Sequence, residues 1–245
     1  MSKVAMVTGA GQGIGKAVAK EMASKGYAVA VCDINTVTGE TTAGELTANG
    51  LEAKSFEVNV TSLDSFNTVV EKIESELGPI EVLVNTVGWD IIEPFMKNSV
   101  EYWEKVIDLN FRSTIYGSRA VLPKMIERQS GRIINIASDA GRVGSLGETV
   151  YAGTKGGVIA FSKSLAREMA RNKITVNVVC PGPTDTPLFA SQPDKNKEAL
   201  IRAIPLRRVA QPEDIAYGVG FFASERANYI TGQVLSVSGG LTMVD

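Results

Sequence analysis

The chain has 245 residues and a net charge of −2, and 44% of its residues are hydrophobic. This is enough for one large α/β domain, and the absence of histidine with only two cysteines, Cys32 and Cys180, argues against a metal site. The evenly spread charge and the lack of any apolar stretch near 18 residues argue against nucleic-acid and membrane partners, and favour a cytoplasmic protein with reduced thiols.

Short apolar runs alternate with helical patterns along the chain. The predicted strands begin at Val4, Ala28, Leu51, Glu81, Arg132, Thr175 and Gln233. The predicted helices cover residues 13–25, 62–77, 99–127, 152–171 and 212–224. Because most apolar runs are nearly continuous in Val, Ile and Ala, they are typical of strands buried on both faces. The alternation predicts an α/β fold: a Rossmann-like, doubly wound parallel sheet of seven strands between two helical layers, in a single domain over residues 1–245.

The first predicted strand runs into a turn, TGAGQGIG, that contains Gly9, Gly11, Gly13 and Gly15. Glycine lets the backbone turn sharply and approach a ligand, and the N-terminus of the helix that follows offers N–H groups to a pyrophosphate. The pattern is TGxxxGxG and not the GxGxxG of many dinucleotide sites. A tight packing turn would use the same glycines, but the flanking strand and helix favour a nucleotide site.

Asp33 closes the second predicted strand, eighteen residues after Gly15. A carboxylate at this place can accept hydrogen bonds from the ribose diol of an adenosine. It would repel a 2′-phosphate, and Gln12 supplies no positive charge to offset that repulsion. The sequence therefore predicts NAD as the cofactor in preference to NADP.

Ser138, Tyr151 and Lys155 lie in the segment SDAGRVGSLGETVYAGTK. Residues four apart share one face of a helix, so the phenol and the ammonium would be neighbours. A fixed cation lowers the pKa of a phenol, which is ordinarily about 10, and the serine hydroxyl could hold the same substrate oxygen. The trio indicates a proton-transfer site without histidine, although the Tyr–Lys spacing alone also fits a packed ring beside a solvated amine.

These motifs, in this order, resemble the short-chain dehydrogenase/reductase family over essentially the whole chain. TGAGQGIG is similar to the family's cofactor turn, YAGTK to its YxxxK element, and PGPTDT to the segment over the nicotinamide. The resemblance implies reversible oxidation of an alcohol with NAD and a homotetramer built on the helices at 99–127 and 152–171. It also implies four catalytic residues, with Tyr151 as acid–base and Ser138 on the substrate oxygen. Lys155 would lower the Tyr151 pKa and bind the ribose, and Asn110 would hold a water.

The resemblance implies a set of cofactor contacts spread along the chain: Gly9, Gln12, Gly13, Ile14, Gly15, Asp33, Asn59, Val60, Asn85, Val87, Gly88, Tyr151, Lys155, Pro181, Gly182, Thr184 and Thr186. Two positions depart from the family pattern. The usual NNAG reads Asn85-Thr86-Val87-Gly88 here, and the usual Asp of the adenine site is Asn59. The Asn59 side-chain oxygen could still accept the adenine amino group, without the charge.

Within the family, the stretches GWDIIEPF, INIASDAGRVGS, VNVVCPGPTDT and ITGQVLSVSGGLTM are similar to the 2-hydroxycyclohexanecarboxyl-CoA dehydrogenases of aromatic and alicyclic acid degradation. This similarity implies a small-molecule substrate of the cyclic hydroxyacyl-CoA type. The expected substrate contacts are Trp89, Asp90, Ser138, Arg142 and Tyr151, beside a substrate-loop insertion at about 186–210. The basic residues of that region would dock the CoA phosphates or form a solvated lid: Lys195, Lys197, Arg202, Arg207 and Arg208.

Three alternatives stay open at this point. One is a 3-oxoacyl-carrier-protein reductase, a group that usually uses NADPH. Another is a different short-chain alcohol dehydrogenase. The third, of another class, is a non-catalytic subunit that keeps the fold and serves assembly.

Overall fold

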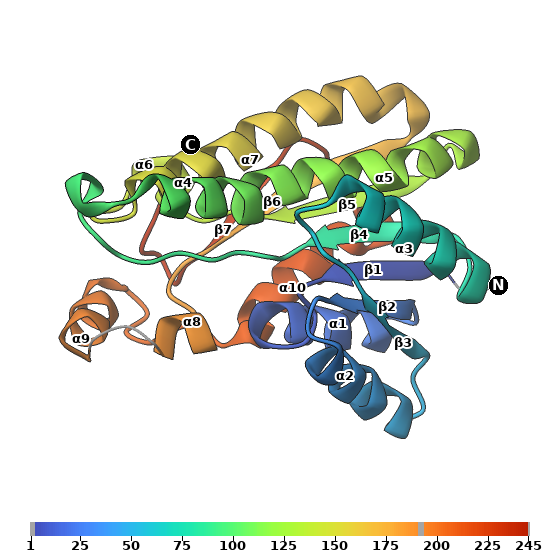
Figure 1. Ribbon diagram of the computed structural model, residues 1–245, viewed down its shortest axis with the longest axis horizontal. Helices are drawn as coiled ribbons and strands as arrows, with labels where there is room; N and C mark the ends of the chain where they lie inside the picture. Colours follow the sequence, from blue (N-terminus) through green and yellow to red (C-terminus); the bar gives the residue numbers. More distant parts are fainter. Residues whose placement is uncertain (1–2, 191–193, 245) are drawn as a thin grey trace.

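The computed structural model describes residues 3–190 and 194–244 (Figure 1). Seven strands form one parallel sheet in the order β3-β2-β1-β4-β5-β6-β7. The strands are β1 Val4–Thr8, β2 Ala28–Asp33, β3 Ala53–Glu57, β4 Ile80–Asn85, β5 Gly131–Ile136, β6 Ile174–Pro181 and β7 Val234–Val237. The predicted fold is confirmed, and each strand lies where an apolar run predicted it.

Helices cover both faces of the sheet and give three layers (Figure 1). Residues of α1 (Gly13–Ser24), α2 (Thr36–Ala48) and α10 (Pro212–Ala223) share one hydrophobic cluster with the strands. Residues of α3 (Leu63–Glu76), α5 (Ser113–Arg128) and α7 (Thr149–Met169) share a second cluster on the opposite face. The chain is therefore doubly wound, as the strand–helix alternation predicts.

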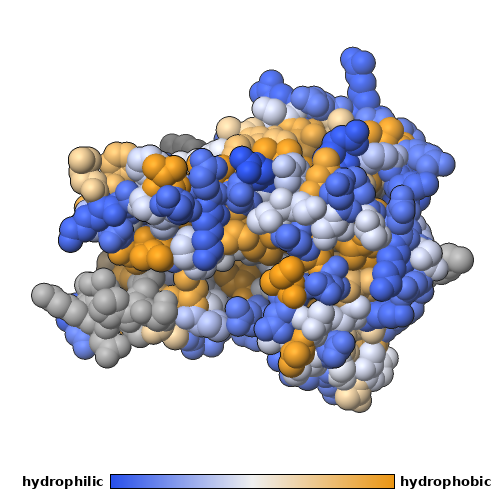
Figure 2. All heavy atoms as spheres, viewed as in Figure 1, coloured by the Kyte–Doolittle hydropathy of each residue, from blue (hydrophilic) through white to orange (hydrophobic). Residues whose placement is uncertain are grey.

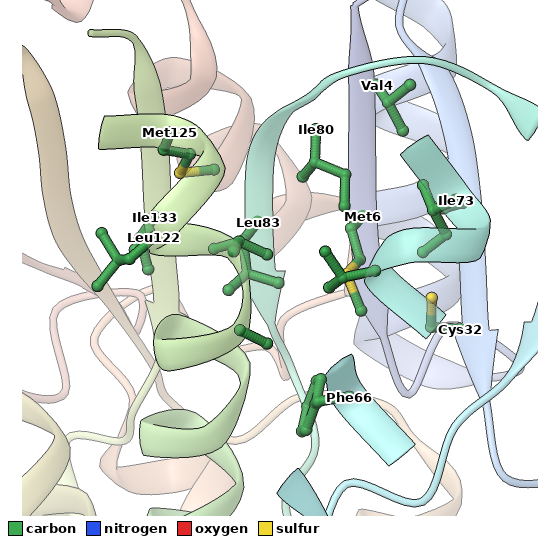
Figure 3. Packing of buried hydrophobic residues seen from close by; sticks show 14 of the residues in the cluster. Val4, Met6, Cys32, Phe66, Ile73, Ile80, Leu83, Leu122, Met125 and Ile133 are labelled. Atoms are coloured by element: carbon green, nitrogen blue, oxygen red, sulfur yellow. The ribbon is translucent and has the colours of Figure 1, made fainter. Parts of the chain in front are cut away.

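The two faces of the central strands β2, β1, β4 and β5 are buried in different clusters. On β1, Val4 and Met6 belong to one cluster while Ala5 and Val7 belong to the other, because successive side chains point to opposite faces. Figure 3 shows strand residues of the second cluster, the one shared with α3, α5 and α7, beside residues of α3 and α5: Met6, Leu83 and Ile133 with Phe66, Ile73, Leu122 and Met125. Burial on both faces explains why these strands read as unbroken apolar runs.

The predicted helix at 99–127 is interrupted in the structure. It consists of α4 (Val100–Ile107), a π-helical turn η2 (Asp108–Arg112) and α5. Asn110 lies inside this turn and is fully buried. Single π-turns inside helices frequently occur at functional sites.

Helix α2 was not predicted. Its sequence, TVTGETTAGELTA, is rich in threonine and glycine, which are poor helix formers. Asn35 caps its start by accepting the N–H groups of Val37 and Thr38. A Cβ at Gly39 would lie 2.7 Å from the Ser55 hydroxyl of β3, so the helix packs closely on the sheet there. Packing against the sheet therefore outweighs weak local propensity.

The described residues of the insertion at 186–210 form α8 (Pro187–Ala190) and α9 (Asp194–Ala203). A parallel bridge between Thr184 and Ala210 closes its base. The remaining short elements are α6 Ala140–Val143, η1 Phe95–Lys97, η3 Ala170–Asn172 and η4 Glu225–Ala227. Within residues 3–190 and 194–244, no helix has the length and apolar character needed to cross a bilayer.

Candidate active site

A cavity of about 1150 Å³ opens at the carboxyl ends of the strands, where β1 and β4 lie side by side and the winding of the sheet reverses. In open α/β sheets, ligands bind at this point. Figure 2 shows a hollow on this face with hydrophobic atoms inside it, between the α4 region and the α1 region. The volume exceeds the roughly 300–1,000 Å³ of ordinary small-molecule pockets, which suits a dinucleotide together with a second ligand.

Most of the predicted site residues line this one cavity. They are Gly9, Gln12, Gly13, Ile14, Gly15, Asp33, Asn59, Val60, Val87, Gly88, Ser138, Tyr151, Lys155, Pro181, Gly182, Thr184 and Thr186. The predicted residues Asn85, Trp89, Asp90, Asn110 and Arg142 do not line it.

The glycine turn folds back on itself more tightly than any side chain would allow. Gly9 has a φ of +61°, and a Cβ at Gly15 would lie 2.1 Å from the Gly9 carbonyl oxygen. Gln12, which precedes α1, makes no side-chain capping bond, so the first N–H groups of α1 stay available. The turn and the start of α1 therefore fit the pyrophosphate of a dinucleotide.

Thr86 and Val87, the departures from the family pattern, pack against this turn. Thr86 Oγ1 donates to the Thr8 carbonyl, and the Thr86 N–H donates to Thr8 Oγ1 at 3.1 Å, so β4 and β1 are joined at their ends. Val87 Cγ2 would lie 3.0 Å from a Cβ at Gly9. The Val87 side chain is larger than the alanine of the usual NNAG, and it fits because Gly9 has no side chain.

Asp33, the residue expected to bind the adenosine ribose, lines the cavity and is held rigidly there. Its Oδ2 accepts the Gly11 N–H at 2.8 Å and its Oδ1 accepts the Asn35 N–H at 2.9 Å. Each oxygen keeps one lone pair for a further donor. Among the described lining residues, Lys155 is the one basic side chain, and it belongs to the trio at the other part of the site.

Asn59 lines the cavity, but its side-chain oxygen is already engaged. It accepts the Thr61 N–H at 3.0 Å and the Thr61 hydroxyl at 2.7 Å. A carbonyl oxygen has two lone pairs, so both are used within the loop. The expectation that this oxygen accepts the adenine amino group is not met by this geometry.

The structure brings Ser138, Tyr151 and Lys155 together. Ser138 follows β5 and lines the cavity together with Tyr151, and its hydroxyl acts to lower the Tyr151 pKa. Tyr151 and Lys155 lie in the first turns of α7, with Lys155 Nζ 5.6 Å from the centre of the Tyr151 ring. Lys155 is only 2% exposed and donates to the Ile136 carbonyl at 3.1 Å.

Burial dominates the ionisation of this trio. It raises the pKa of Tyr151 above its ordinary value, and the Ser138 hydrogen bond opposes that rise. Burial also lowers the pKa of Lys155 to about 8. The net pKa of Tyr151 is therefore raised in the protein by itself, because burial penalises the phenolate, and the lowering of that pKa by Lys155 stays a prediction.

Asn110 and Asn85 support the site from behind. The Asn110 amide donates to the carbonyls of Trp89 and Val106 at 2.7 and 2.9 Å, and its oxygen accepts the Trp89 N–H at 3.2 Å. Asn85 donates to Asn135, which donates to Ser162 of α7, each at 2.9 Å. Asn110 holds the loop that follows β4, and Asn85 ties the sheet to the helix that carries Tyr151.

Three of the expected substrate contacts do not reach the cavity. The Trp89 ring lies beneath the Lys105 ammonium of α4, 3.9 Å from ring centre to Nζ. Asp90 is buried against Tyr102 of α4. Arg142 donates to the Ser236 hydroxyl at 2.7 Å and the Val244 carbonyl at 2.8 Å, so it fastens the C-terminal segment.

An apolar wall lines the cavity instead; Leu188, Phe189 and Leu200 of this wall lie in the segment Leu188 to Leu206 that the sequence predicts for the pocket, and its other residues were not predicted individually. This wall consists of Ile92, Pro94, Val143, Leu146, Leu188, Phe189, Leu200 and Leu241. These residues come from four separate irregular or short segments, so no periodic pattern marked them. Glu148, which also lines the cavity, was missed for the same reason.

The arginines of the insertion region have partners within the protein. Arg208 forms an ion pair with Asp214 at 2.5 Å, Arg207 donates to the Arg202 carbonyl, and Arg202 lies 3.9 Å from Glu198. The side chains of Lys195 and Lys197 lie outside the described residues. This arrangement favours the solvated lid over a phosphate-docking surface.

Comparison with known proteins adds a family and several relatives. A model of the family described as short chain dehydrogenase matches residues 3–197. The chain is 40% identical over 243 residues to the 3-oxoacyl-(acyl-carrier-protein) reductase of Escherichia coli K12, covering 99% of this chain and 98% of that one. The reductase of the same name from Haemophilus influenzae is 41% identical over 240 residues, with 98% of each chain covered. That of Staphylococcus aureus Mu50 is 38% identical over 244 residues, with 99% of each covered.

These relatives are 3-oxoacyl-(acyl-carrier-protein) reductases by name and not 2-hydroxycyclohexanecarboxyl-CoA dehydrogenases. They correct the narrower resemblance inferred from the stretches around Trp89, Ser138 and Pro181. Those stretches lie at the carboxyl ends of β4, β5 and β6, where residues serve a shared site geometry as well as one substrate.

Proposed function

Because this chain belongs to the short-chain dehydrogenase family, and so is an oxidoreductase that uses a nicotinamide cofactor on CH–OH and C=O groups, we propose that it interconverts 3-hydroxyacyl and 3-oxoacyl thioesters with NAD(H). One observation carries the proposal. Ser138, Tyr151 and Lys155 line the same cavity as the glycine turn and Asp33.

Asp33 supports NAD(H) over the phosphorylated cofactor. Its two oxygens are fixed by Gly11 and Asn35, with lone pairs left for a ribose diol. The Asp33 carboxylate would repel a 2′-phosphate at this place. Among the described lining residues, no basic side chain lies beside Asp33 to offset that repulsion.

The bound cofactor supplies hydride acceptance and donation, and the protein supplies position and proton transfer. Tyr151 takes the proton of the carbinol in oxidation and returns it in reduction. Ser138 donates a hydrogen bond to the same substrate oxygen and stabilises the charge that develops on it. Lys155 holds the ribose of the cofactor and contributes positive charge beside the phenol.

The apolar wall supports an acyl substrate. Ile92, Val143, Leu146 and Leu188 line the part of the cavity that the irregular segments enclose, and they suit a hydrocarbon chain or ring. The names of the relatives favour a 3-oxoacyl group on a carrier protein. A CoA thioester with a cyclic hydroxyacyl group, in aromatic acid degradation, is the substrate to compare with it.

The decisive experiment is a nicotinamide absorbance assay across substrates and variants. The substrates are 3-oxoacyl thioesters of carrier protein and of CoA, a cyclic 2-hydroxyacyl-CoA and free secondary alcohols. Tyr151→Phe should lower kcat by about 10²–10⁴-fold, since it removes only the acid–base hydroxyl. Tyr116→Phe, a partly buried ring in the core cluster, is the matched control and should keep activity. Near wild-type turnover in Tyr151→Phe, or no turnover of any thioester, would refute the proposal.

Two further properties belong to the same proposal. The protein forms a homotetramer of the 26.1 kDa chain, which apolar side chains exposed on the long helices, such as Val100 and Ile126, support. It works in the cytoplasm, which its two buried free thiols support. Light scattering after size exclusion measures the mass. Titration with NAD tests the alternative of a non-catalytic subunit, which would bind no cofactor.

A further inference from the structure

Asp90 is a buried carboxyl group with one oxygen engaged and the other not. The residue is 9% exposed, and the Tyr102 phenol of α4 donates to Oδ1 at 2.5 Å. Oδ2 has no hydrogen-bond partner among the described residues. A buried carboxylate oxygen without a donor is costly, so this atom points to a missing proton or a missing donor.

Glu148 supplies the neighbouring group. It precedes α7, three residues before Tyr151, and lines the cavity. The Glu93 N–H donates to the Gly147 carbonyl at 2.9 Å, so the chain at Glu148 lies against the loop that carries Asp90, and the Glu148 carboxyl group acts on the Asp90 pKa. Two adjacent carboxylates repel each other, whereas one proton between them removes the repulsion and satisfies the open oxygen.

We propose that Asp90 is protonated in the working enzyme and donates from Oδ2 to the Glu148 carboxylate, so that the pair places one negative charge, and not two, beside Tyr151. Asp90 then acts through Glu148 on the acid–base residue and is a positioning residue. The link to Tyr151 rests on the proposed function, while the protonation of Asp90 does not.

The electrostatic surroundings agree with this assignment. Burial, followed by the Glu148 charge, raises the pKa of Asp90 to about 7, and the Tyr102 hydrogen bond opposes the rise. The titratable groups facing the pair are Tyr102 of α4 and Tyr151 of α7. The Asp90 charge also acts on Lys155 of α7, whose pKa it raises, and Cys180 of β6 acts on both Tyr151 and Lys155. Lys105 of α4 covers the adjacent Trp89 ring.

Deprotonation of Asp90 has a defined effect on Tyr151. The negative charges of Glu148 and Asp90 both raise the Tyr151 pKa, so a second charge in the pair opposes formation of the phenolate. The rate of alcohol oxidation should therefore show an inflection near neutral pH. Above that pH, the rate should rise less steeply than it would if Tyr151 titrated alone.

Infrared spectroscopy tests the proton without any activity. The wild-type protein, compared between about pH 6 and about pH 8, should lose the carbonyl stretch of a protonated carboxyl group, and Asp90→Asn should lack that change. This substitution keeps an acceptor for Tyr102 and places an N–H toward Glu148, so the fold should persist, which thermal melting checks. The same change in wild type and Asp90→Asn, or no change in either, would overturn the proposal.

The pH profile of kcat/KM for alcohol oxidation then tests the link to Tyr151. Asp90→Asn should abolish the neutral inflection and raise the rate above it, by about tenfold for one unit in the Tyr151 pKa. Tyr102→Phe should move the inflection to higher pH, because it removes the donor that favours the Asp90 anion, and Glu148→Gln should move it lower. Glu93→Gln, a carboxyl group bonded to Asn98 on the same loop, is the control and should leave the inflection in place.

The outcomes separate the two proposals. If no thioester is turned over, the proposed function fails while the infrared result still decides the protonation of Asp90. If turnover is normal and Tyr102→Phe and Glu148→Gln move the inflection in the same direction or not at all, the carboxyl pair does not act on Tyr151.

Discussion

The Asp33 carboxylate accepts the backbone N–H of Gly11 at 2.8 Å, and this bond ties the end of β2 to the glycine turn between β1 and α1. A Cβ at Gly11 would lie 2.8 Å from the same oxygen, so the two residues leave no room for a side chain between them. The residue proposed to select the cofactor is thereby fixed to the turn proposed to hold its pyrophosphate.

We expect Asp33→Ser to lower kcat/KM for NAD by about 10–100-fold, since it removes charge-assisted hydrogen bonds to the ribose diol. The kcat/KM for NADP should fall less or rise, because the Asp33 charge that repels the 2′-phosphate is gone. Glu57→Ser, at the neighbouring position of β3, is the control and should change neither. Initial rates with both cofactors measure the ratio, and a wild-type protein that prefers NADP would contradict the assignment.

Gly15→Ala should disrupt the cofactor turn. The new Cβ would meet the Gly9 carbonyl oxygen at 2.1 Å, so the backbone has to shift, and we expect NAD binding to be lost along with about 1–3 kcal/mol of stability. Gly44→Ala, within α2 and with nothing near the added Cβ, should instead stabilise by about 0.5–1 kcal/mol. Calorimetric NAD titration and denaturant melts distinguish the two, and normal NAD affinity in Gly15→Ala would count against the tight turn.

Alcohol oxidation should quicken from neutral into alkaline pH, because burial holds the Tyr151 pKa high and the phenolate forms only as pH rises. Ser138→Ala removes the hydrogen bond that lowers this pKa, so its rising limb should move to higher pH in addition to losing rate. Ser145→Ala, on the same cavity wall, should leave the limb in place. The pH dependence of kcat/KM is the measurement, and an unmoved limb in Ser138→Ala would show that Ser138 does not act on Tyr151.

Lys155→Met should abolish turnover and yet stabilise the protein at neutral pH, by on the order of 1–3 kcal/mol. Burial lowers the pKa of Lys155 from 10.5 to about 8, so between these values the unfolded chain binds more protons and stability rises with pH. The stability gained by Lys155→Met should therefore be complete below about pH 8 and should shrink as the pH approaches 10.5. Melts across this range test it, with the exposed Lys163→Met expected to stay within about 0.5 kcal/mol.

The sequence predicts the sheet well and the helices less evenly. All seven strands were found. Those buried on both faces carry their signal in the chain itself as apolar runs, whereas only Phe56 of β3 is buried, so burial on both faces does not explain that strand. Helix α2 was not predicted because its threonines and glycines give no local signal and its stability comes from contacts with β3. The π-turn at Asp108–Arg112 was not predicted because a helical pattern does not show where one extra residue enters a turn.

The candidate site also contains residues that the sequence identifies and residues that it does not. Ser138, Tyr151, Lys155 and the glycine turn follow short local motifs, so their spacing identifies them. Asp90 and Glu148 are 58 residues apart in the sequence and meet only through the loop after β4 and the start of α7. Arg142 was expected to contact the substrate, but the C-terminal segment, which no local pattern places, occupies its guanidinium.

The reversal of winding between β1 and β4 makes the chain modular. Strands β3, β2 and β1 with the start of α1 carry the surfaces assigned to the adenosine and the pyrophosphate, whereas β5, β6 and the segments after them carry the residues assigned to the reaction, the surface assigned to the nicotinamide and most of the apolar wall. The two sets meet along one seam of the sheet. A chimera that joins the first half of this chain to the second half of a relative would exchange one specificity while retaining the other, so the fold lets cofactor preference and substrate choice evolve separately.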